Sequence, residues 1–333
     1  MSTLSVDLSE GVSYEEVKGP LIDKLTASQK EFTNGFIRLH PYNQVFPREF
    51  LRFEKRLKNF EIRDQDIWVA SFPKCGTTWT QEMVWNIVHK LDFDTAKKVT
   101  LDDRVPYFEL SSIVGEAVTD EFEDSLKKVK EITVDPRIIK THLSFDMLPN
   151  QIMEKQAKVI YVTRNPRDTA VSYYNHWKVL EGYKGSFEDF MELFLTDVCG
   201  YYTPFVGHVL SYWNQIHHSN ICFITYEDMK KDLGGVIRKV SKFLESPVSE
   251  EDVSALEKHL SFDSMKKNKA VNKADFVERC NKAFGVDSDP QGFMRKGQTG
   301  NWRLHFTPEL EEKFIDWEQK WLKDSDFKFV YDL

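Results

Sequence analysis

The 333-residue sequence lacks any excess of positive charge: 45 Lys and Arg stand against 53 Asp and Glu, and the formal net charge is −8. This balance argues against a protein that binds nucleic acid or an anionic membrane over a broad basic face. No apolar run approaches the ~18 residues of a membrane-spanning helix. The polar, acidic start MSTLSVDLSEGVSYEE is no signal peptide. An anionic ligand would therefore need a local cluster of positive groups.

Cysteine is also scarce, and its four copies are widely spaced, at Cys75, Cys199, Cys222 and Cys280. Without a CxxC pair or a His/Cys metal spacing, the simplest interpretation is free thiols in a cytoplasmic protein. Linkers rich in Pro, Gly or Ser, low-complexity tracts and internal repeats are absent too. We therefore expect an N-terminal extension with some helix over residues 1–45 and a single domain over residues 46–333.

Four short apolar runs predict buried strands: DIWVASF (66–72), PRIIKTH (136–142), KVIYVTR (158–164) and NICFITY (220–226). Strands buried on both faces of a parallel sheet have this nearly continuous hydrophobicity. Segments with helical periodicity follow or lie between them, at 78–91, 168–182, 233–245 and 308–324, the last with Thr307 as N-cap and Pro308 at its first position. The alternation predicts a three-layer α/β sandwich with a central parallel sheet. Residues 266–300 are expected to be loop-like.

Ligands of such sheets sit beyond the carboxyl ends of the strands. Polar segments leave each predicted strand there: PKCGTTW, THLSF, RNPRD and YED. All four should face one crevice.

The segment ASFPKCGTTW (70–79) predicts an anion site of the P-loop-like strand–loop–helix type. Backbone N–H groups and the helix dipole would point at one spot, Gly76 would allow close approach, and Lys74 would add a full charge. The structural alternative is a capped turn with a surface lysine. The segment is no Walker A loop, because the lysine precedes the glycine and Cys75 replaces the hydroxyl that would hold Mg²⁺. A less charged group that needs no divalent ion, such as a sulfuryl group, would suit it.

These segments together resemble the cytosolic sulfotransferases. FPKCGTTW resembles the family's 5′-phosphosulfate loop, KTHLSFDMLP its catalytic strand end, RNPRDTAVSYY its 3′-phosphate segment and FMRKGQTGNWRLHFT its C-terminal RKGxxGxW segment. The motifs follow the family's order and span residues 72–307. The resemblance implies a transferase that moves the sulfuryl group of 3′-phosphoadenosine-5′-phosphosulfate (PAPS) to a hydroxyl or amine, leaving adenosine 3′,5′-bisphosphate (PAP).

The resemblance also implies roles for single residues. His142 would be the general base, while Lys74 and Lys140 would act on the leaving oxygen and the sulfuryl group, as in-line transfer requires. Cofactor contacts would come from Lys74, Cys75, Gly76, Thr77, Thr78, Trp79, Arg164, Ser172, Tyr226, Ser261, Phe262, Phe293, Met294, Arg295, Lys296 and Gly297. Structural alternatives stay open for several of them, such as an ion pair between Arg164 and Asp168 or core packing of Trp79.

The acceptor pocket is expected to be apolar, with candidates Tyr107, Leu110, Phe145, His176 and Phe284. By resemblance, residues 276–292 would form a lid with Gly285 and Gly292 as hinges. Phenols, steroids, retinoids and other small lipophilic alcohols would fit, and the sequence does not choose among them.

The chain departs from the family pattern at several positions. Cys75 replaces a common serine, and Leu260 replaces a hydroxyl residue near adenine. The vertebrate dimer motif KxxxTVxxxE is altered to Arg303, Thr307, Pro308 and Glu312. The arginine and the proline count against that mode of dimerisation, and a homodimer stays open. The pattern looks closer to invertebrate members, a group that includes a retinol dehydratase. Three alternatives remain: an enzyme like that dehydratase, a non-catalytic nucleotide-gated binder of lipophiles, and a P-loop kinase.

Overall fold

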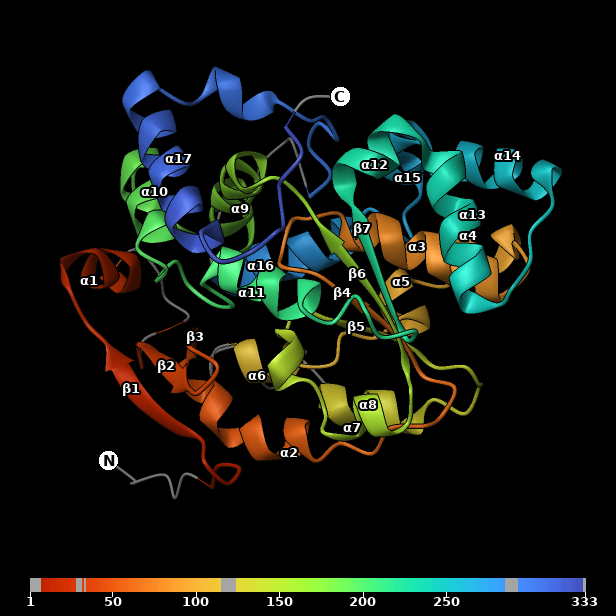
Figure 1. Cartoon of the computed structure of the whole chain (residues 1–333), viewed down its shortest axis with the longest axis horizontal. Coiled ribbons are helices and arrows are strands. Elements are labelled where there is room, and N and C mark those ends of the chain that lie inside the picture. Colours follow the sequence, from red (N-terminus) through yellow and green to blue (C-terminus); the bar gives the residue numbers. More distant parts are fainter. Residues whose placement is uncertain (1–6, 28–31, 33, 115–123, 285–292, 332–333) are drawn as a thin grey trace.

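The computed structural model describes residues 7–27, 32, 34–114, 124–284 and 293–331. Its centre is a four-stranded parallel sheet with strand order β5-β4-β6-β7 (Figure 1). The strands are β4 (Ile67–Ala70), β5 (Ile138–Thr141), β6 (Lys158–Thr163) and β7 (Ile221–Thr225). They lie within the four apolar runs, so the predicted α/β fold with a central parallel sheet is confirmed.

The strands read as apolar runs because both faces of the sheet are covered. All four residues of β4 are buried. Trp68 and Ala70 pack into the core on one face, and Ile67 and Val69 pack into the core on the other. Since successive side chains of a strand point to opposite faces, two helical layers are needed to bury them all.

Helices from separate parts of the chain make these layers: one layer appears at the right of Figure 1, and the other at the left and along the bottom. The core that contains Ile67 and Val69 also contains side chains from α3 (Thr77–Val88), α4 (Phe93–Lys98), α5 (Leu101–Arg104), α12 (Tyr226–Lys231), α13 (Leu233–Leu244), α14 (Glu250–His259) and α15 (Phe262–Lys267). The core that contains Trp68 and Ala70 also contains side chains from α1 (Pro20–Ala27), α2 (Glu54–Lys58), α6 (Leu110–Ile113), α7 (Ser125–Glu131), α8 (Gln151–Glu154), α9 (Pro166–Leu180), α10 (Phe187–Leu195), α11 (Phe205–Trp213) and α17 (Pro308–Leu322). The start of α17 is as predicted, because Thr307 accepts a hydrogen bond from the N–H of Leu310.

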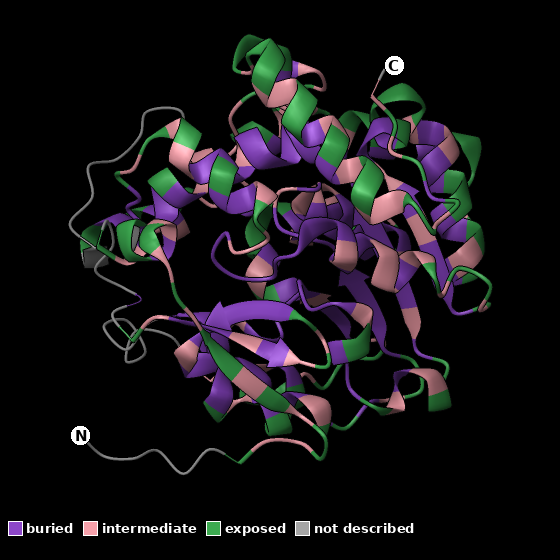
Figure 2. Ribbon diagram, turned by 60° about the vertical axis from the view of Figure 1, so that its left-hand side comes forward, coloured by how far each residue is buried: buried purple, intermediate pink, exposed green. Residues whose placement is uncertain are grey.

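The chain before β4 forms a small antiparallel sheet of β1 (Ser13–Val17), β2 (Phe36–His40) and β3 (Gln44–Pro47), followed by η1 (Arg48–Arg52). The sequence predicted some helix here, and α1 is present, but it did not predict the sheet. Side chains of β2 and β3 belong to the same core as the central sheet (Figure 2). β3 crosses the predicted boundary at residue 45, and the division of the chain there remains a prediction.

The sequence predicts a loop over residues 266–300, but part of this segment is helical. Helix α16 (Ala274–Phe284) lies within it, and Val277 packs against Val179 and Leu180 at the end of α9. The sequence did not predict this helix because its apolar residues are few and stand among many polar ones, as expected for a helix that packs along only one side. Over the described ranges, no helix is both long enough and apolar enough to cross a bilayer.

Candidate functional site

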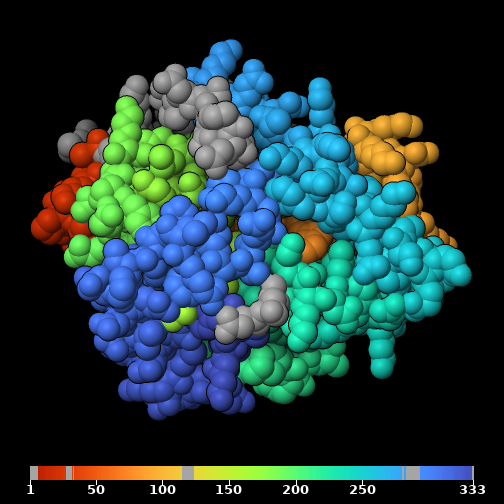
Figure 3. All heavy atoms as spheres, turned by 90° about the horizontal axis from the view of Figure 1, so that it is seen from above, coloured from red at the N-terminus to blue at the C-terminus, as the bar shows by residue number. Residues whose placement is uncertain are grey.

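The carboxyl ends of the four parallel strands open onto one cavity of about 500 Å³. Figure 3 shows the orange atoms of the chain near β4 at the bottom of a hollow between blue and cyan segments that come later in the sequence. The sequence-predicted residues that line the cavity are Lys74, Gly76, Thr77, Thr78, Trp79, Tyr107, Leu110, Lys140, His142, Arg164, Ser172, His176, Tyr226, Phe262, Phe293, Met294, Arg295, Lys296 and Gly297. The strand topology therefore brings all four polar motifs to one place.

The loop between β4 and α3 turns sharply to point the helix N-terminus at the cavity. Lys74 and Gly76 both have left-handed backbone angles, with φ of 69° and 104°. A Cβ at Gly76 would lie 2.8 Å from the Cδ2 atom of Tyr226. Both the left-handed backbone and this close approach therefore require glycine at position 76. Because Gly76 is the N-cap of α3 and has no capping side chain, the first amides of the helix are available to an anion.

Two half-buried lysines face the cavity, and each lies over an aromatic ring. The Nζ atom of Lys74 is 3.9 Å from the ring centroid of Phe293, and that of Lys140 is 3.6 Å from the ring centroid of Tyr107. Burial, with smaller effects of Arg164 and Arg295, lowers the pKa of Lys74 to about 7. Burial, and next Lys273, lowers the pKa of Lys140 to about 7. A bound anion would stabilise the charged form of both ammonium groups.

His142 is held in one tautomer and one orientation. Its Nδ1 lies 2.6 Å from the carbonyl oxygen of Ser71, so Nδ1–H donates to that oxygen and Nε2 keeps its lone pair. The Nε2–H of His208 donates to the carbonyl oxygen of His142 at 2.9 Å. Burial, and next Lys140, lowers the pKa of His142 well below its ordinary value. The imidazole is therefore neutral near pH 7 and able to accept a proton.

The C-terminal motif is fastened to the start of α9. Asp168 accepts hydrogen bonds from the backbone N–H groups of Gly300 at 2.7 Å and Trp302 at 3.1 Å. The Nη2 of Arg164 donates to the carbonyl oxygen of Gln298 at 2.6 Å and lies 3.6 Å from Asp168. The buried Nε of Arg164 has no hydrogen-bond partner among the residues that the structure describes. An anion near this corner would meet a guanidinium that is already oriented.

Aromatic side chains make the neighbouring wall. Trp79 and Tyr226 pack edge to face with ring centroids 5.5 Å apart. Gly297 has a φ of 61°, and a Cβ there would lie 2.3 Å from the Cδ2 atom of Phe262. Close approach of the C-terminal loop to Phe262 therefore depends on glycine at position 297. These flat surfaces are suited to a purine base.

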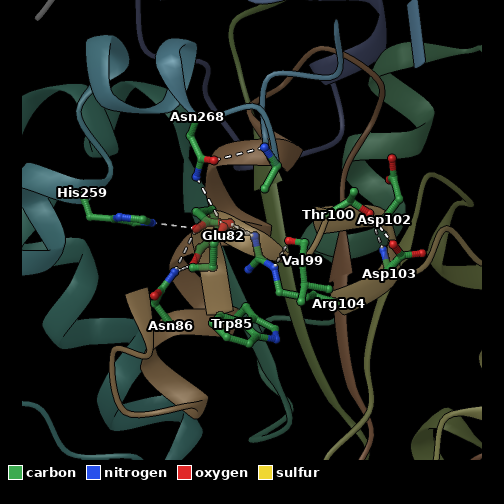
Figure 4. A network of polar contacts seen from close by, with 12 residues as sticks. Glu82, Trp85, Asn86, Val99, Thr100, Asp102, Asp103, Arg104, His259 and Asn268 are labelled. Carbon is green, nitrogen blue, oxygen red and sulfur yellow. Dashed lines mark hydrogen bonds and ion pairs between the residues drawn. The ribbon is translucent and has the colours of Figure 1, made fainter. Parts of the chain in front are cut away.

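A buried polar network fixes this wall from behind (Figure 4). Glu82 on α3 accepts hydrogen bonds from Arg104 at 2.7 Å, His259 at 2.7 Å and Asn86 at 3.1 Å. Although burial acts to raise it, the hydrogen bond from His259 and the charge of Arg104 hold the pKa of Glu82 below its ordinary value. The network joins α3, α5 and the end of α14, which leads directly to Phe262.

One part of the remaining lining is apolar, next to polar and charged side chains that include Asp102, Lys128, Lys273, Glu181 and Tyr201. The apolar part includes Leu110, Ile113, Val114, Leu180 and Phe276. The hydroxyl of Tyr201 donates to Glu181 at 2.5 Å, and the Nε2 of His176 lies 4.0 Å from the same carboxylate. This lobe is suited to a small lipophilic molecule.

Four predicted site residues are not placed in the cavity lining. The thiol of Cys75 is buried and faces Thr169, with sulfur and hydroxyl oxygen 3.6 Å apart. Ser261 caps α15 by accepting from the N–H of Ser264. Phe145, in η3 (Phe145–Met147), packs on Tyr212 instead, with ring centroids 5.6 Å apart, because the chain turns away after His142. The side chain of Phe284, and the hinges Gly285 and Gly292, lie outside the described residues.

Sequence reasoning missed residues that contact the site from distant segments. Ser71 and Glu109 hold His142, while Asp102 and Lys273 form an ion pair at the cavity. The one feature of the sequence that pointed to Glu109 is a carboxylate within the apolar VPYFEL run. No local pattern pointed to Ser71, Asp102 or Lys273, because their partners lie between 71 and 171 positions away.

PAPS combines a 5′-phosphosulfate, a 3′-phosphate and an adenine, and the cavity offers a partner to each. Lys74 and the N-terminus of α3 lie at one corner, Arg164 and Arg295 line another, and Trp79 and Phe262 provide ring surfaces. The buried, unpaired Nε of Arg164 is the kind of group that a phosphate satisfies. The residues present therefore fit this group.

Comparisons with known proteins agree with this geometry. A family model described as "Sulfotransferase domain" matches residues 64–326. The chain is 39% identical to luciferin sulfotransferase of Photinus pyralis, over 89% of this chain and 82% of that protein. It is 33% identical to sulfotransferase 1E1 of Homo sapiens, over 91% of this chain and 98% of that one. The solved structure of retinol dehydratase in complex with androsterone and inactive cofactor PAP matches with a TM-score of 0.87 at 29% identity, over 97% of this chain and 99% of that chain.

The extent of these matches settles the family and the donor. The family model covers the central sheet and the segments that line the cavity, and the similar solved structure holds PAP. The chain therefore belongs to the sulfotransferase family and is a PAPS-dependent enzyme that transfers a sulfuryl group to a small-molecule acceptor.

Proposed function

We propose that this enzyme sulfonates a hydroxyl group, or an amine, of a small lipophilic acceptor such as a phenol, steroid or retinoid, with His142 as the general base. The observation that carries the proposal is the tautomer of His142. Its Nδ1–H is bonded to Ser71, which leaves Nε2 as the proton acceptor in the cavity that Lys74 and Lys140 also face.

In the proposed mechanism, PAPS supplies the sulfuryl group and the phosphate that leaves. Nε2 of His142 takes the proton of the acceptor hydroxyl during attack, which contributes roughly 10²–10⁴-fold to the rate. Lys74 and the amides of α3 stabilise negative charge on the departing oxygen, and Lys140 stabilises charge on the sulfuryl oxygens. The Nδ1–H bond to Ser71 then steadies the imidazolium.

The remaining predicted contacts complete the donor site. Arg164, Ser172, Arg295 and Lys296 would hold the 3′-phosphate, Trp79 and Phe262 would flank adenine, and Tyr226 would reach its edge. What supports these roles is that all seven side chains line the same cavity as His142. An Arg164→Met variant would then bind PAP weakly while binding adenosine 5′-phosphate as the wild type does, in titration calorimetry.

The acceptor class is supported by the apolar lobe and by the relatives. Leu110, Ile113, Val114 and Leu180 offer no charge to an acceptor. One relative is named for luciferin, and the similar solved structure contains androsterone. A screen of luciferin, phenols, sterols, retinoids and catecholamines with PAPS, read by mass spectrometry, would identify the acceptor.

The base is tested with His142→Ala, measured by transfer of radiolabelled sulfuryl groups. We expect kcat to fall by roughly 10²–10⁴-fold and the affinity for PAP to stay unchanged, because no described contact of the phosphate corners involves His142. His217→Ala, at an exposed histidine in the turn after α11, is the matched control. Near wild-type turnover of His142→Ala would remove the base assignment.

A second outcome of catalysis follows from the similarity to retinol dehydratase, whose structure matches at a TM-score of 0.87. With an allylic alcohol, the C–O bond of the sulfate ester formed first would break, and loss of sulfate and of a proton would leave a new C=C bond. Mass spectrometry of the retinol product distinguishes the two outcomes, since the ester gains the mass of a sulfuryl group and the anhydro product loses that of water.

Location and assembly are also proposals. Free buried thiols at Cys75, Cys199 and Cys222 support a cytoplasmic protein. A homodimer through the segment of the altered dimer motif would bury Leu304, which lies within η4 (Asn301–Leu304) and is 76% exposed. Light scattering of Leu304→Glu against the wild type would test the dimer, and cell fractionation would test the location.

A further inference from the structure

Glu109 is a fully buried carboxylate beside the catalytic strand, and no motif assigned it a role. It follows the short segment that pairs with the edge of β5, where the N–H of Phe108 donates to the carbonyl oxygen of Lys140 at 2.8 Å. A buried carboxylate is costly unless hydrogen bonds satisfy it, so its partners indicate what it stabilises.

Three donors converge on this carboxylate. The backbone N–H of His142 lies 2.6 Å from Oε1, the hydroxyl of Thr141 lies 2.8 Å from Oε2, and the hydroxyl of Tyr202 lies 3.0 Å from Oε1. Two of the three come from the strand end that carries the base. A carboxylate accepts all three bonds, whereas a protonated acid must donate one of its own.

The third donor extends the network into the cavity. The hydroxyl groups of Tyr202 and Tyr107 are 2.6 Å apart. The Tyr107 ring packs edge to face on His142, with ring centroids 5.3 Å apart, and lies under the ammonium of Lys140. Glu109 therefore connects to His142 through its backbone and to Lys140 through an oriented ring.

We propose that Glu109 is a positioning residue for sulfuryl transfer, whose carboxylate fixes the backbone of Thr141 and His142 and, through Tyr202, the Tyr107 ring against His142 and Lys140. The inference rests on the proposed role of His142 as base. The negative charge of Glu109 also offsets the imidazolium that forms when His142 takes the acceptor proton.

The charge of Glu109 makes the proposal testable by pH. Burial, against the hydrogen bonds, raises the pKa of Glu109 to about 7. The titratable groups that face it are His142, Lys140, Tyr107, Tyr202 and Tyr212. Since the pKa of His142 lies well below its ordinary value, we expect protonation of Glu109 to lower kcat below about pH 7.

The test is Glu109→Gln, which keeps the shape of the side chain and removes its charge. We expect kcat to fall by roughly 10²-fold, as misplacement of a reacting group costs. The KM for PAPS and the affinity for PAP should stay unchanged, and the acid limb of kcat near pH 7 should disappear. Glu54→Gln is the matched control, because Glu54 is equally buried and accepts from the N–H of Ser9 at 2.8 Å.

A second variant, Tyr202→Phe, keeps the charge of Glu109 and removes the link to Tyr107. We expect it to lower kcat less than Glu109→Gln does and to keep the acid limb. If the circular dichroism spectrum shows that Glu109→Gln does not fold, Tyr202→Phe is used instead, and its kcat and KM are compared with those of the wild type. An unchanged kcat in Tyr202→Phe would then overturn the proposal.

Other results would also overturn it: wild-type kcat in Glu109→Gln, or a lower kcat that retains the acid limb. If the wild-type enzyme transfers no sulfuryl group to any acceptor of the screen, the proposed function fails, and the NMR spectrum of the His142 ring, recorded above pH 7, decides the inference separately. Changed ring resonances of His142 in Glu109→Gln, with those of His217 unchanged, support the positioning role, and an unchanged His142 spectrum refutes it.

Discussion

Proton uptake at Lys74 on cofactor binding is the sharpest consequence of the buried site. Burial lowers the pKa of Lys74 to about 7, so at pH 8 about a tenth of these side chains are protonated. A bound phosphate raises this pKa again, because an opposite charge favours the ammonium form. Binding of PAP at pH 8 should therefore take up about 0.9 proton at Lys74.

The same linkage sets the sign of the pH dependence. The pKa of Lys74 is higher in the complex than in the free enzyme, so the full affinity is present below about pH 7 and is lost as pH rises towards the pKa of the complex. Over that range, each pH unit should weaken PAP binding by about tenfold. The second ionisation of the ligand's phosphate, near pH 6, is complete at pH 8 and adds little.

Calorimetric titration with PAP in buffers of different ionisation enthalpy measures the uptake. Lys74→Arg keeps its charge at every pH, so it should take up about one proton fewer and show a flatter affinity profile. The exposed Lys230, whose ammonium lies 6.0 Å from the ring centroid of Trp79, gives the matched control Lys230→Arg. Equal buffer dependence in the wild type and Lys74→Arg would refute the reasoning.

Three further predictions concern stability and the acceptor lobe. Gly76→Ala forces a left-handed residue against Tyr226, so it should destabilise the fold by about 1–3 kcal/mol in thermal denaturation and weaken PAP binding; an unchanged Tm would contradict this. Arg104→Met leaves the buried charge of Glu82 without its arginine partner and should cost about 3–5 kcal/mol in urea unfolding, whereas a loss below 1 kcal/mol would mean that His259 suffices. Leu180→Arg should raise the KM for lipophilic acceptors without changing PAP affinity, and steady-state kinetics against calorimetry would show whether the lobe has been assigned correctly.

The order of the chain explains why so much of the site could be predicted. In a parallel sheet every carboxyl end meets the same edge, so the residues after β4, β5, β6 and β7 had to converge once the strands were recognised. Lys74, His142, Arg164 and Tyr226 follow directly from that rule. Phe145 shows the limit of this rule, since it lies four residues past the end of β5, where the chain has turned away and the ring packs on Tyr212.

The sequence by itself determined the four strands of the central sheet, the helices that follow them, and the anion-binding features of the loop at residues 70–79, because these depend on neighbours within a few positions. Only the tertiary structure decided that Glu109 and Ser71 hold His142, that the N-terminal strands share the core, and that Lys74 and Lys140 have depressed pKa values. Such properties arise from desolvation and from contacts between segments far apart in the chain, and no local pattern of residues encodes how deeply a side chain will be buried or which distant group will face it.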